Sequence, residues 1–315
     1  MAVGKSFSFL KAKTETFLTQ LLTMQNNFES FEEAITVATG NTFQSIGESS
    51  LSGGCINQAS KISGKDGRDF FVKRNSLDFL PFFEAEGRAL REIASTRTIK
   101  VPETITHGTT SNHSFIVLDF IQEGVSSAKA QEDMGRQLAD LHRIKQTHFG
   151  WSMDNCIGAT PQPNPPTNRW IDFYRQYRLE HQFQLANSKG TTFSGSHELL
   201  DKLEVFFADY EPFASLLHGD LWGGNASYDQ DGKPFIFDPA SYYGDRETDL
   251  AFTYMFGGFS NAFYQAYDES FPLHSGFEDR KILYNLYHEL NHFNLFGGGY
   301  GNSAQSSIHR LLSKI

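Results

Sequence analysis

Cysteine is scarce in this chain of 315 residues, which contains only Cys55 and Cys156. Two cysteines cannot form the framework of several disulfides found in small secreted domains, so we expect a reducing, cytoplasmic location. Long apolar runs are also missing, since no stretch approaches the roughly 18 residues of a transmembrane helix, and no membrane association is expected. Residues 1–24 have an apolar pattern that Glu15 interrupts, which does not match a cleaved signal peptide.

Basic residues are also fewer than acidic ones. The chain has 27 Lys and Arg against 37 Asp and Glu, which gives a formal net charge of −10. No basic run is long enough to indicate a nucleic-acid partner. Repeats and low-complexity tracts are absent, and 30 Phe and 12 Tyr supply ample material for a core. The composition therefore predicts an ordinary globular protein.

The most informative segment is 216–225. Its residues His218, Asp220, Leu221 and Asn225 occupy every fixed position of the H-x-D-L-x-x-x-N pattern of a kinase catalytic loop. A polar turn between two apolar strands is the alternative interpretation. Four fixed residues seldom match by chance, so the pattern favours the catalytic loop of a phosphotransferase.

Asp238 follows an apolar, β-prone run and ends it, as the metal-binding aspartate of a kinase does. Phosphoryl transfer requires a protein to position oxygens and to neutralise charge, with little covalent chemistry of its own. We predict that Asp220 is the catalytic residue and accepts the proton of the attacking hydroxyl. Asn225 and Asp238 are predicted to bind Mg²⁺, which prefers few protein ligands plus phosphate oxygens and water. ATP is the expected phosphate donor.

A second group of residues predicts a nucleotide site. Lys73 ends an alternating apolar strand, where a kinase lysine contacts the α- and β-phosphates. Glu86 on the following helix is its predicted partner, with Glu84 as the competing choice. Gly53 and Gly54 lie in the first predicted hairpin, although the full G-x-G-x-x-G is missing and a plain β-turn is the alternative. The residues predicted to offer backbone groups to adenine are Leu118, Asp119, Phe120 and Ile121.

The order of the expected elements indicates an α+β, two-lobed architecture. Residues 1–40 are predicted to form an N-terminal helical extension. Residues 41–121 form a small, antiparallel, β-rich N-lobe that binds nucleotide, with one main helix at 81–95, and residues 122–315 form a larger helical C-lobe with the catalytic loop and the substrate site. Strands are expected within 42–61 and at 69–73, 101–107 and 114–120. Helices of the C-lobe are expected at 131–145, 169–186, 196–210, 247–256, 261–267, 278–296 and 303–312.

Segments along nearly the whole chain from about Ser49 resemble the fructosamine kinase (ketosamine 3-kinase) family, within the aminoglycoside-phosphotransferase-like branch of the protein-kinase-like fold. These segments are Gly53–Asn57, Phe70–Lys73, Phe83–Glu86, Gly135–His142, Pro161–Asn164, Leu216–Asn225, Phe237–Glu247, Met255–Phe259 and Leu290–Gly297. The resemblance implies that ATP phosphorylates the 3-hydroxyl of a ketosamine, such as a free or protein-bound fructosyl- or ribulosyl-lysine. The 3-phosphate is unstable and releases the amine, which implies deglycation and protein repair.

Two other functions stay open at this point. One is a small-molecule kinase of the aminoglycoside or choline phosphotransferase type. The other is a nucleotide-binding protein without activity, against which the intact Asp220, Asn225, Asp238 and Lys73 argue.

Substrate contact is predicted for Trp222, Asp245, His288 and Asn291. Trp222 could stack on the sugar or its amine, whereas Trp170 is expected to be a buried aromatic residue. A surface ion pair is the alternative for Asp245. His288 and His292 lie four residues apart on a predicted helix, but zinc binding is not favoured because no third ligand is evident.

Three further residues have predicted supporting roles. Asp249 and His218 are expected to hold the catalytic loop rather than to contact substrate. Cys55 lies in the nucleotide loop, where backbone amides and Lys73 would lower the pKa of its thiol. The same position is associated with redox-sensitive dimerisation in related kinases, so a monomer or a redox-dependent homodimer is expected, with a small strand residue as the alternative interpretation of Cys55.

Overall fold

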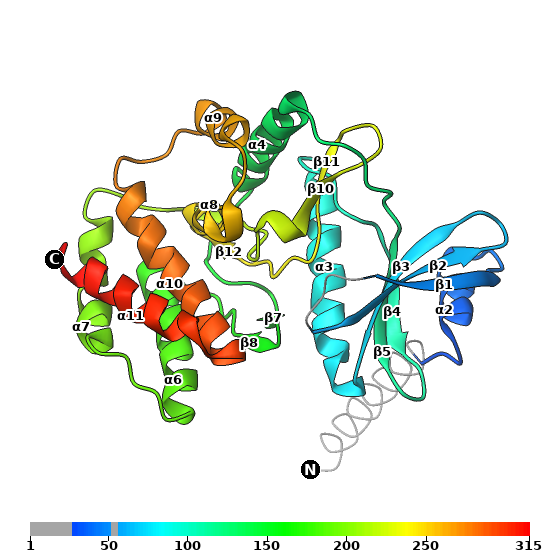
Figure 1. Cartoon of the computed structure of the whole chain (residues 1–315), viewed down its shortest axis with the longest axis horizontal. Coiled ribbons are helices and arrows are strands. Elements are labelled where there is room, and N and C mark those ends of the chain that lie inside the picture. The colour runs from blue at the N-terminus through cyan, green and yellow to red at the C-terminus, as the bar shows by residue number, and fades with distance from the viewer. Residues whose placement is uncertain (1–26, 52–55) are drawn as a thin grey trace, which may run out of the picture. The chain divides into compact units, whose positions relative to one another are not determined.

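The computed structural model describes residues 27–51 and 56–315, which form two compact units (Figure 1). One unit contains the described residues up to Gly87 together with Thr104–Phe120, and the other contains Arg88–Glu103 and Ile121–Ile315. Residues 1–26 of the predicted N-terminal helical extension and the predicted residues Gly53, Gly54 and Cys55 lie outside the described residues. No helix among the described residues is long and apolar enough to span a membrane.

The first unit is built on a five-stranded antiparallel sheet with the strand order β1-β2-β3-β5-β4. Its strands are β1 (Ser45–Leu51), β2 (Gln58–Gly64), β3 (Asp69–Asn75), β4 (Thr104–Thr109) and β5 (Ser114–Asp119). The register places Lys73 of β3 opposite Ala59 of β2 and Ile116 of β5. Lys73 therefore lies on the central strand of the sheet.

Helix α2 (Phe31–Thr39) packs against this sheet. It begins after Ser30, whose side-chain oxygen accepts a hydrogen bond from the Glu33 amide, and ends at Gly40, which has a φ of 68°. The shared core contains Ala34, Ile35, Phe43, Ile62, Phe70, Val72, Phe115 and Val117. Because side chains alternate along a strand, Phe70 and Val72 of β3 face this core and Lys73 points to the other face.

The units differ from the predicted domain boundaries in two places. Helix α2 belongs with the sheet because its apolar face packs into the core of the first unit, whereas residues 1–40 were predicted to be an extension. Helix α3 (Leu80–Thr96) contributes to both units, so residues 88–103 group with the second.

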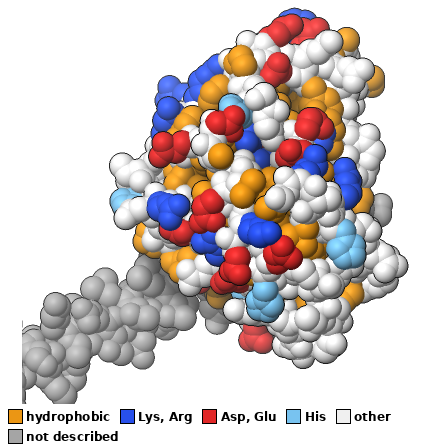
Figure 2. All heavy atoms as spheres, turned by 90° about the vertical axis from the view of Figure 1, so that its left-hand side faces the viewer, with side chains coloured by type: hydrophobic (Ala, Val, Ile, Leu, Met, Phe, Trp, Pro, Cys, Tyr) orange, Lys and Arg blue, Asp and Glu red, His pale blue; other side chains and the backbone are white. Residues whose placement is uncertain are grey.

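The second unit is mainly helical, in agreement with the predicted α+β fold. Its helices are α4 (Ala128–His142), α5 (Trp170–Tyr174), α6 (His181–Ser188), α7 (Ser196–Asp201), α8 (Glu247–Thr253), α9 (Asn261–Ser270), α10 (Phe277–Phe296) and α11 (Gly299–Leu312). Helices α4 and α9 pack side by side, and α10 packs against α6, α8 and α11. Figure 2 shows the side that carries α7 and α11, where acidic and basic side chains are interspersed rather than gathered by sign.

Short paired strands complete the second unit. β6 (Lys145–Gln146), β9 (Ala214–Leu216) and β12 (Tyr243–Gly244) form one sheet, β7 (Asn155–Ile157) pairs with β8 (Thr160–Gln162), and β10 (Ala226–Tyr228) pairs with β11 (Pro234–Ile236). The strand predicted to end at Asp238 thus ends two residues earlier. The predicted helix 196–210 is shorter than expected, because α7 gives way to a 3₁₀ segment at Leu203–Phe207.

Candidate active site

The predicted catalytic loop runs between β9 and β10 of the second unit. The Leu217 N–H donates to the Tyr242 carbonyl at 3.1 Å, and the Ala240 N–H donates to the His218 carbonyl at 2.9 Å. The backbone around the loop is therefore hydrogen-bonded to the segment that follows Asp238. This pairing explains how two stretches separated in sequence reach one site.

Asp249 of α8 binds the backbone of the catalytic loop through its carboxylate. Its Oδ2 accepts the His218 N–H at 2.7 Å, and its Oδ1 accepts the Gly219 N–H at 2.8 Å. The Nε2 of His218 lies 2.9 Å from the Phe237 carbonyl, and burial lowers the pKa of this ring. The structural roles predicted for Asp249 and His218 are confirmed by these contacts.

A chain of buried hydrogen bonds extends from Asp249 into the interior, and sequence reasoning missed it. His142 Nε2 lies 3.1 Å from Asp249 Oδ2, and His142 Nδ1 lies 2.7 Å from the Tyr267 hydroxyl. Because a carboxylate only accepts, Nε2 donates, and the Tyr267 hydroxyl donates to Nδ1. Arg246 in turn donates to the Tyr267 oxygen at 3.0 Å. Every member has a defined donor or acceptor role, which fixes the position of Asp249.

Three parts of the site lie close together near the β10–β11 ribbon. They are Asp220, Asn225 and the start of residues 237–241, which form the Asp238 segment. The Asn225 Nδ2 donates to the Asp220 carbonyl at 2.8 Å and to Asp220 Oδ2 at 3.1 Å. The Phe237 N–H donates to the Asn225 carbonyl at 3.0 Å, which places Asp238 beside Asn225 in the chain trace. Asp238 has a φ of 58°, a left-handed conformation uncommon for a residue with a side chain.

The donor chemistry of these residues fits Mg²⁺. Both side-chain hydrogen bonds of Asn225 use its nitrogen and neither engages its amide oxygen, which is a type of ligand that Mg²⁺ accepts. Within the described ranges, no group of three or more His, Cys, Asp or Glu side chains could hold a metal by itself. A site with one amide and one carboxylate suits an ion that also keeps water and phosphate oxygens.

In the first unit, Lys73 forms the predicted ion pair with Glu86. Its Nζ lies 2.7 Å from Glu86 Oε1, and the two side chains are only 5% and 12% exposed. Glu86 is therefore the partner, rather than the competing Glu84. Contact of Lys73 with phosphate stays a prediction.

The predicted adenine-contacting backbone lies at the end of β5. Leu118 pairs with Phe71 and Asp119 with Phe70, and the Phe120 N–H donates to the Asp69 carbonyl at 3.3 Å. Ile121 follows and belongs to the second unit. Contact of these residues with adenine stays a prediction.

Trp222 is a partly exposed aromatic residue two positions after Asp220. Its ring packs edge-on against Phe256, with 5.6 Å between ring centroids. Phe256 is 51% exposed and has a φ of 56°, which is strained for a bulky residue. Sequence reasoning missed Phe256, although the adjacent Gly257-Gly258 pair signals an irregular turn. Trp222 and Phe256 thus form an exposed aromatic pair.

The fructosamine kinase family model matches residues 27–314. This chain belongs to the fructosamine kinase family. A probable ketoamine kinase from Synechocystis sp. is 43% identical over 286 residues, which cover 90% of this chain and 97% of that protein. The chloroplastic protein-ribulosamine 3-kinase of Arabidopsis thaliana is 40% identical over 272 residues, which cover 84% of this chain and 82% of the relative.

The fold agrees with this membership. The crystal structure of a protein from Haemophilus somnus 129PT, named a putative fructosamine-3-kinase, superposes with a TM-score of 0.84 at 29% identity. The match covers 92% of this chain and 99% of that one. The predicted protein-kinase-like fold is confirmed by this likeness and by more distant phosphotransferases of the same fold. The chain is accordingly an ATP-dependent kinase, as its loop pattern predicted.

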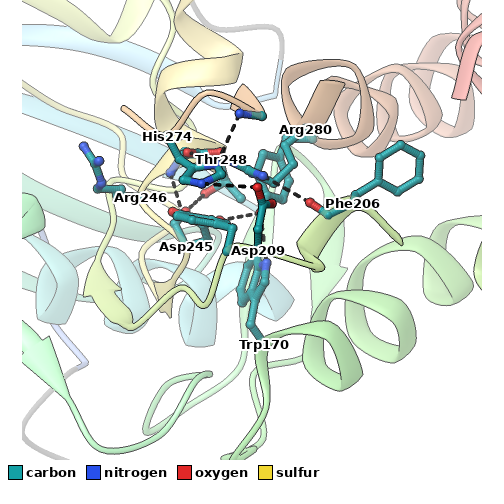
Figure 3. A network of polar contacts seen from close by, with 12 residues as sticks. Trp170, Phe206, Asp209, Asp245, Arg246, Thr248, His274 and Arg280 are labelled. Carbon is teal, nitrogen blue, oxygen red and sulfur yellow. Dashed lines mark hydrogen bonds and ion pairs between the residues drawn. The ribbon is translucent and has the colours of Figure 1, made fainter. Parts of the chain in front are cut away.

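The structure of this fructosamine kinase does not support the predicted substrate contact of Asp245. The side chain is 1% exposed and lies within a network of polar contacts (Figure 3). Its Oδ1 accepts the Tyr210 hydroxyl at 2.9 Å, and its Oδ2 accepts the Tyr284 hydroxyl at 2.5 Å. Burial raises the pKa of Asp245. The alternative of a surface ion pair is wrong for the same reason, because the residue is inside.

Arg280 and Glu247 form a buried ion pair in the same network (Figure 3). Arg280 Nε donates to Glu247 Oε2 at 2.7 Å and Arg280 Nη2 donates to Oε1 at 3.1 Å, with both side chains at most 1% exposed. Arg280 Nη1 also donates to the Phe206 carbonyl at 3.1 Å. Burial, opposed by Arg280, raises the pKa of Glu247 to about 7.

His288 and Asn291 are also interior residues, so their predicted substrate contact is not supported. The ring of His288 is 4% exposed and stacks on Phe252, with centroids 3.5 Å apart and planes 7° apart. Asn291 is 2% exposed, donates to the Ile157 carbonyl at 3.4 Å and accepts from Gln182 at 3.2 Å. Helix α10 turns both side chains inward because their spacing places them on its packed face.

Trp170 occupies the interior, as predicted. It is 3% exposed, and its Nε1 donates to the Tyr284 hydroxyl at 3.0 Å.

The buried histidines predict loss of stability in mild acid. Burial holds the pKa of His288 well below 6.5, so the unfolded chain binds the proton first. The stabilising contribution is complete above about pH 6.5 and falls as the pH drops below it. We expect His288→Leu to reduce the slope of unfolding free energy against pH between 6.5 and 5 by up to about 1.4 kcal/mol per pH unit. Urea unfolding at a series of pH values measures this slope.

His197→Leu is the matched control, because His197 is exposed. Asp245 and Glu247 have raised pKa values, so their contribution to the free energy of unfolding grows as the pH falls, opposite to that of His288. This contribution is common to wild type, His288→Leu and His197→Leu. Equal slopes for the His288 variant and wild type would contradict this account.

Gly219 is expected to be indispensable in the loop. It has a φ of 83°, and a Cβ at this position would lie 2.1 Å from the Ala240 carbonyl oxygen. We expect Gly219→Ala to lower the free energy of unfolding by about 2–4 kcal/mol, from strain and overpacking, and to abolish detectable transfer. Gly223→Ala is the control because a Cβ at Gly223 meets nothing within 4 Å, and it should change stability by less than about 0.5 kcal/mol. Thermal unfolding that ranks the two variants alike would refute the packing argument.

Proposed function

We propose that this fructosamine kinase transfers the γ-phosphate of ATP to the 3-hydroxyl of ketosamines of the fructosyl- and ribulosyl-lysine type. The observation that supports it most directly is the position of Asp220. Its carboxylate accepts a hydrogen bond from Asn225, and its loop is held through backbone amides by Asp249. A carboxylate fixed in this way is suited to accept a proton from an attacking hydroxyl.

The remaining polar residues have separate roles in this proposal. Asn225 and Asp238 hold Mg²⁺, which, when bound with nucleotide, neutralises charge on the phosphate oxygens. Lys73 binds the α- and β-phosphates of ATP, and Glu86 fixes its ammonium group through the 2.7 Å ion pair. Burial of both side chains strengthens this electrostatic arrangement.

The aromatic pair Trp222 and Phe256 is proposed to contact the sugar or its amine. An aromatic face packs well on the C–H side of a sugar, and a secondary ammonium group gains from the negative face of the ring. Trp222 follows Asp220 by two residues, so this surface belongs to the loop that receives the hydroxyl. We expect Trp222→Ala to raise the KM for ketosamine more than the KM for ATP.

The chemistry of the product supports a deglycation role. A phosphate on carbon 3 lies next to the 2-keto group of an Amadori adduct, where it is a good leaving group. Enolisation of the adduct to its 1,2-enaminol expels inorganic phosphate from carbon 3. Water then hydrolyses the resulting imine at carbon 1, which frees the amine and leaves a 3-deoxy-2-ketoaldehyde. The relative from Arabidopsis thaliana, named a protein-ribulosamine 3-kinase, is consistent with this type of substrate.

Turnover with defined acceptors tests the proposal. The purified protein is incubated with Mg²⁺, ATP and one acceptor at a time: fructosyl-lysine, ribulosyl-lysine, an aminoglycoside or choline. ³¹P NMR identifies the phosphorylated carbon, and release of free lysine is followed in parallel. Transfer to either ketosamine at its 3-hydroxyl is expected. Transfer to the aminoglycoside or choline without transfer to either ketosamine would refute it and favour the alternative type of small-molecule kinase.

A further inference from the structure

Two buried amides contact the backbone just beyond Asp238. Asn155 Nδ2 donates to the Ser241 carbonyl at 2.8 Å, and Gln162 Nε2 donates to the Ala240 carbonyl at 3.2 Å. Asn155 and Gln162 belong to the β7–β8 hairpin and are only 4% and 1% exposed. Neither side chain is available to solvent, so their hydrogen bonds serve the interior of the second unit.

The two amides are themselves locked in orientation. Gln162 Nε2 donates to Asn155 Oδ1 at 2.8 Å, and Asn164 Nδ2 donates to the same oxygen at 2.9 Å. The Tyr287 hydroxyl donates to Gln162 Oε1 at 2.6 Å. Rotation of either amide would replace these bonds by unfavourable donor–donor or acceptor–acceptor contacts. The direction of their N–H groups toward the Asp238 segment is therefore fixed.

Arg178 holds the network of amides through Asn164 and the neighbouring backbone. Its Nη2 donates to Asn164 Oδ1 at 2.7 Å, and its Nη1 donates to the Pro163 carbonyl at 2.8 Å. The guanidinium is fully buried and lies 4.0 Å from the ring centroid of Tyr242, and it forms no ion pair with any described residue. Arg178 lies in a π-helical turn, Arg175–Glu180, between α5 and α6. Such turns often occur near functional sites.

We propose that Asn155, Gln162 and Arg178 are positioning residues that aim Asp238 at the metal ion. This inference rests on the proposed function, in which Asp238 binds Mg²⁺. Asp238 lies outside regular secondary structure and has a φ of 58°, so the hold on the residues after it helps to set the direction of its side chain. Those residues are held on one side by the His218 carbonyl, which accepts the Ala240 N–H, and on the other by the two amides.

Metal affinity in the presence of nucleotide tests the proposal without relying on turnover. Free Mn²⁺ is quantified by electron paramagnetic resonance during titration of the full chain with ADP present. We expect Asn155→Leu to weaken Mn²⁺ binding by about 10-fold or more, as loss of groups that orient metal ligands does. The Mg²⁺ concentration for half-maximal activity should rise in the same proportion, with a smaller change in kcat at saturating Mg²⁺.

The matched control is Asn294→Leu. Asn294 is 6% exposed, and its amide nitrogen donates to the Gln182 carbonyl and side chain rather than to the Asp238 segment. Tyr287→Phe is a milder second variant, should Asn155→Leu fail to fold, and is expected to weaken Mn²⁺ binding in the same direction. In a protein that already carries Asp238→Asn, neither Asn155→Leu nor Tyr287→Phe should weaken Mn²⁺ binding further.

The outcomes separate the two proposals. Mn²⁺ affinities that are equal in Asn155→Leu, Asn294→Leu and wild type, or in Tyr287→Phe, Asn294→Leu and wild type if Asn155→Leu does not fold, would overturn the positioning role while leaving the proposed function intact. A wild-type protein that transfers phosphate to ketosamine without any divalent cation would overturn the metal role of Asp238, and with it this inference.

Discussion

Asp220→Asn should reduce kcat by about 10²–10⁴-fold while leaving the Kd for magnesium-ATP within about twofold of wild type. The amide cannot accept the proton of the attacking hydroxyl, but it has almost the same size as the carboxylate. The Asn225 amide can still donate to the Asp220 carbonyl, a bond of 2.8 Å that does not involve the substituted side chain. The loop should therefore keep its shape. A coupled ATPase assay with ketosamine measures kcat, and calorimetry measures nucleotide binding.

The control for this charge change is Asp231→Asn. Asp231 is an exposed residue in the turn between β10 and β11, so the variant loses one negative charge but not the proposed proton acceptor. It should retain full turnover. If Asp220→Asn lost nucleotide binding instead of kcat, Asp220 would be part of the nucleotide or metal site rather than the base.

Arg280→Met is expected to be the most destabilising single change, with a loss of about 3–5 kcal/mol in the free energy of unfolding. It removes the cation from Glu247 and leaves Glu247 and the neighbouring Asp245 as two buried carboxylates. Without Arg280 the pKa of Glu247 should rise further. The loss should therefore be smaller at pH 5.5 than at pH 8, because protonation removes the uncompensated charge. Denaturant unfolding at the two pH values measures the difference.

Arg136→Met is the matched control on α4. Arg136 and Glu132 form an ion pair at 3.0 Å with side chains 45% and 41% exposed, and such surface pairs contribute only about 0–1 kcal/mol. Similar losses for the two arginine variants would mean that burial does not decide the strength of the Arg280 pair.

Local patterns predicted the parts of the site that depend on short-range spacing. The loop residues and Asp238 follow from a fixed motif, and Lys73 follows from the alternation of one strand. Glu86 pairs with Lys73 because it lies on the helix that follows β3. Asp249 could be assigned a structural role from its position eleven residues after Asp238, and His218 because Asp220 is the better-placed base in the same motif. The two-unit α+β architecture follows from the order of strands and helices.

Burial of polar side chains could not be predicted in the same way. Asp245, His288 and Asn291 have the polarity of substrate-binding residues, yet each has its partners on segments distant in sequence, such as Tyr210 for Asp245 and Phe252 for His288. Apart from β11, which lies within the strand predicted to end at Asp238, the short strands of the second unit were missed because their pairing depends on tertiary contacts rather than on a long alternating pattern. The roles of the Asn155 and Gln162 amides in the β7–β8 hairpin were not predicted for the same reason.

The left-handed backbone of Asp238 has a consequence for how this enzyme can evolve. A residue with a side chain is less stable in that conformation than glycine, by an amount on the order of 1 kcal/mol. Asp238→Gly should therefore relieve backbone strain at the very position whose carboxylate is proposed to bind the metal. Glycine would suit this backbone conformation, but it would remove the proposed metal ligand together with the contacts that the Asp238 side chain makes. Backbone relaxation and the proposed metal role are thus opposed at this residue, and stabilising changes have to be sought elsewhere in the chain.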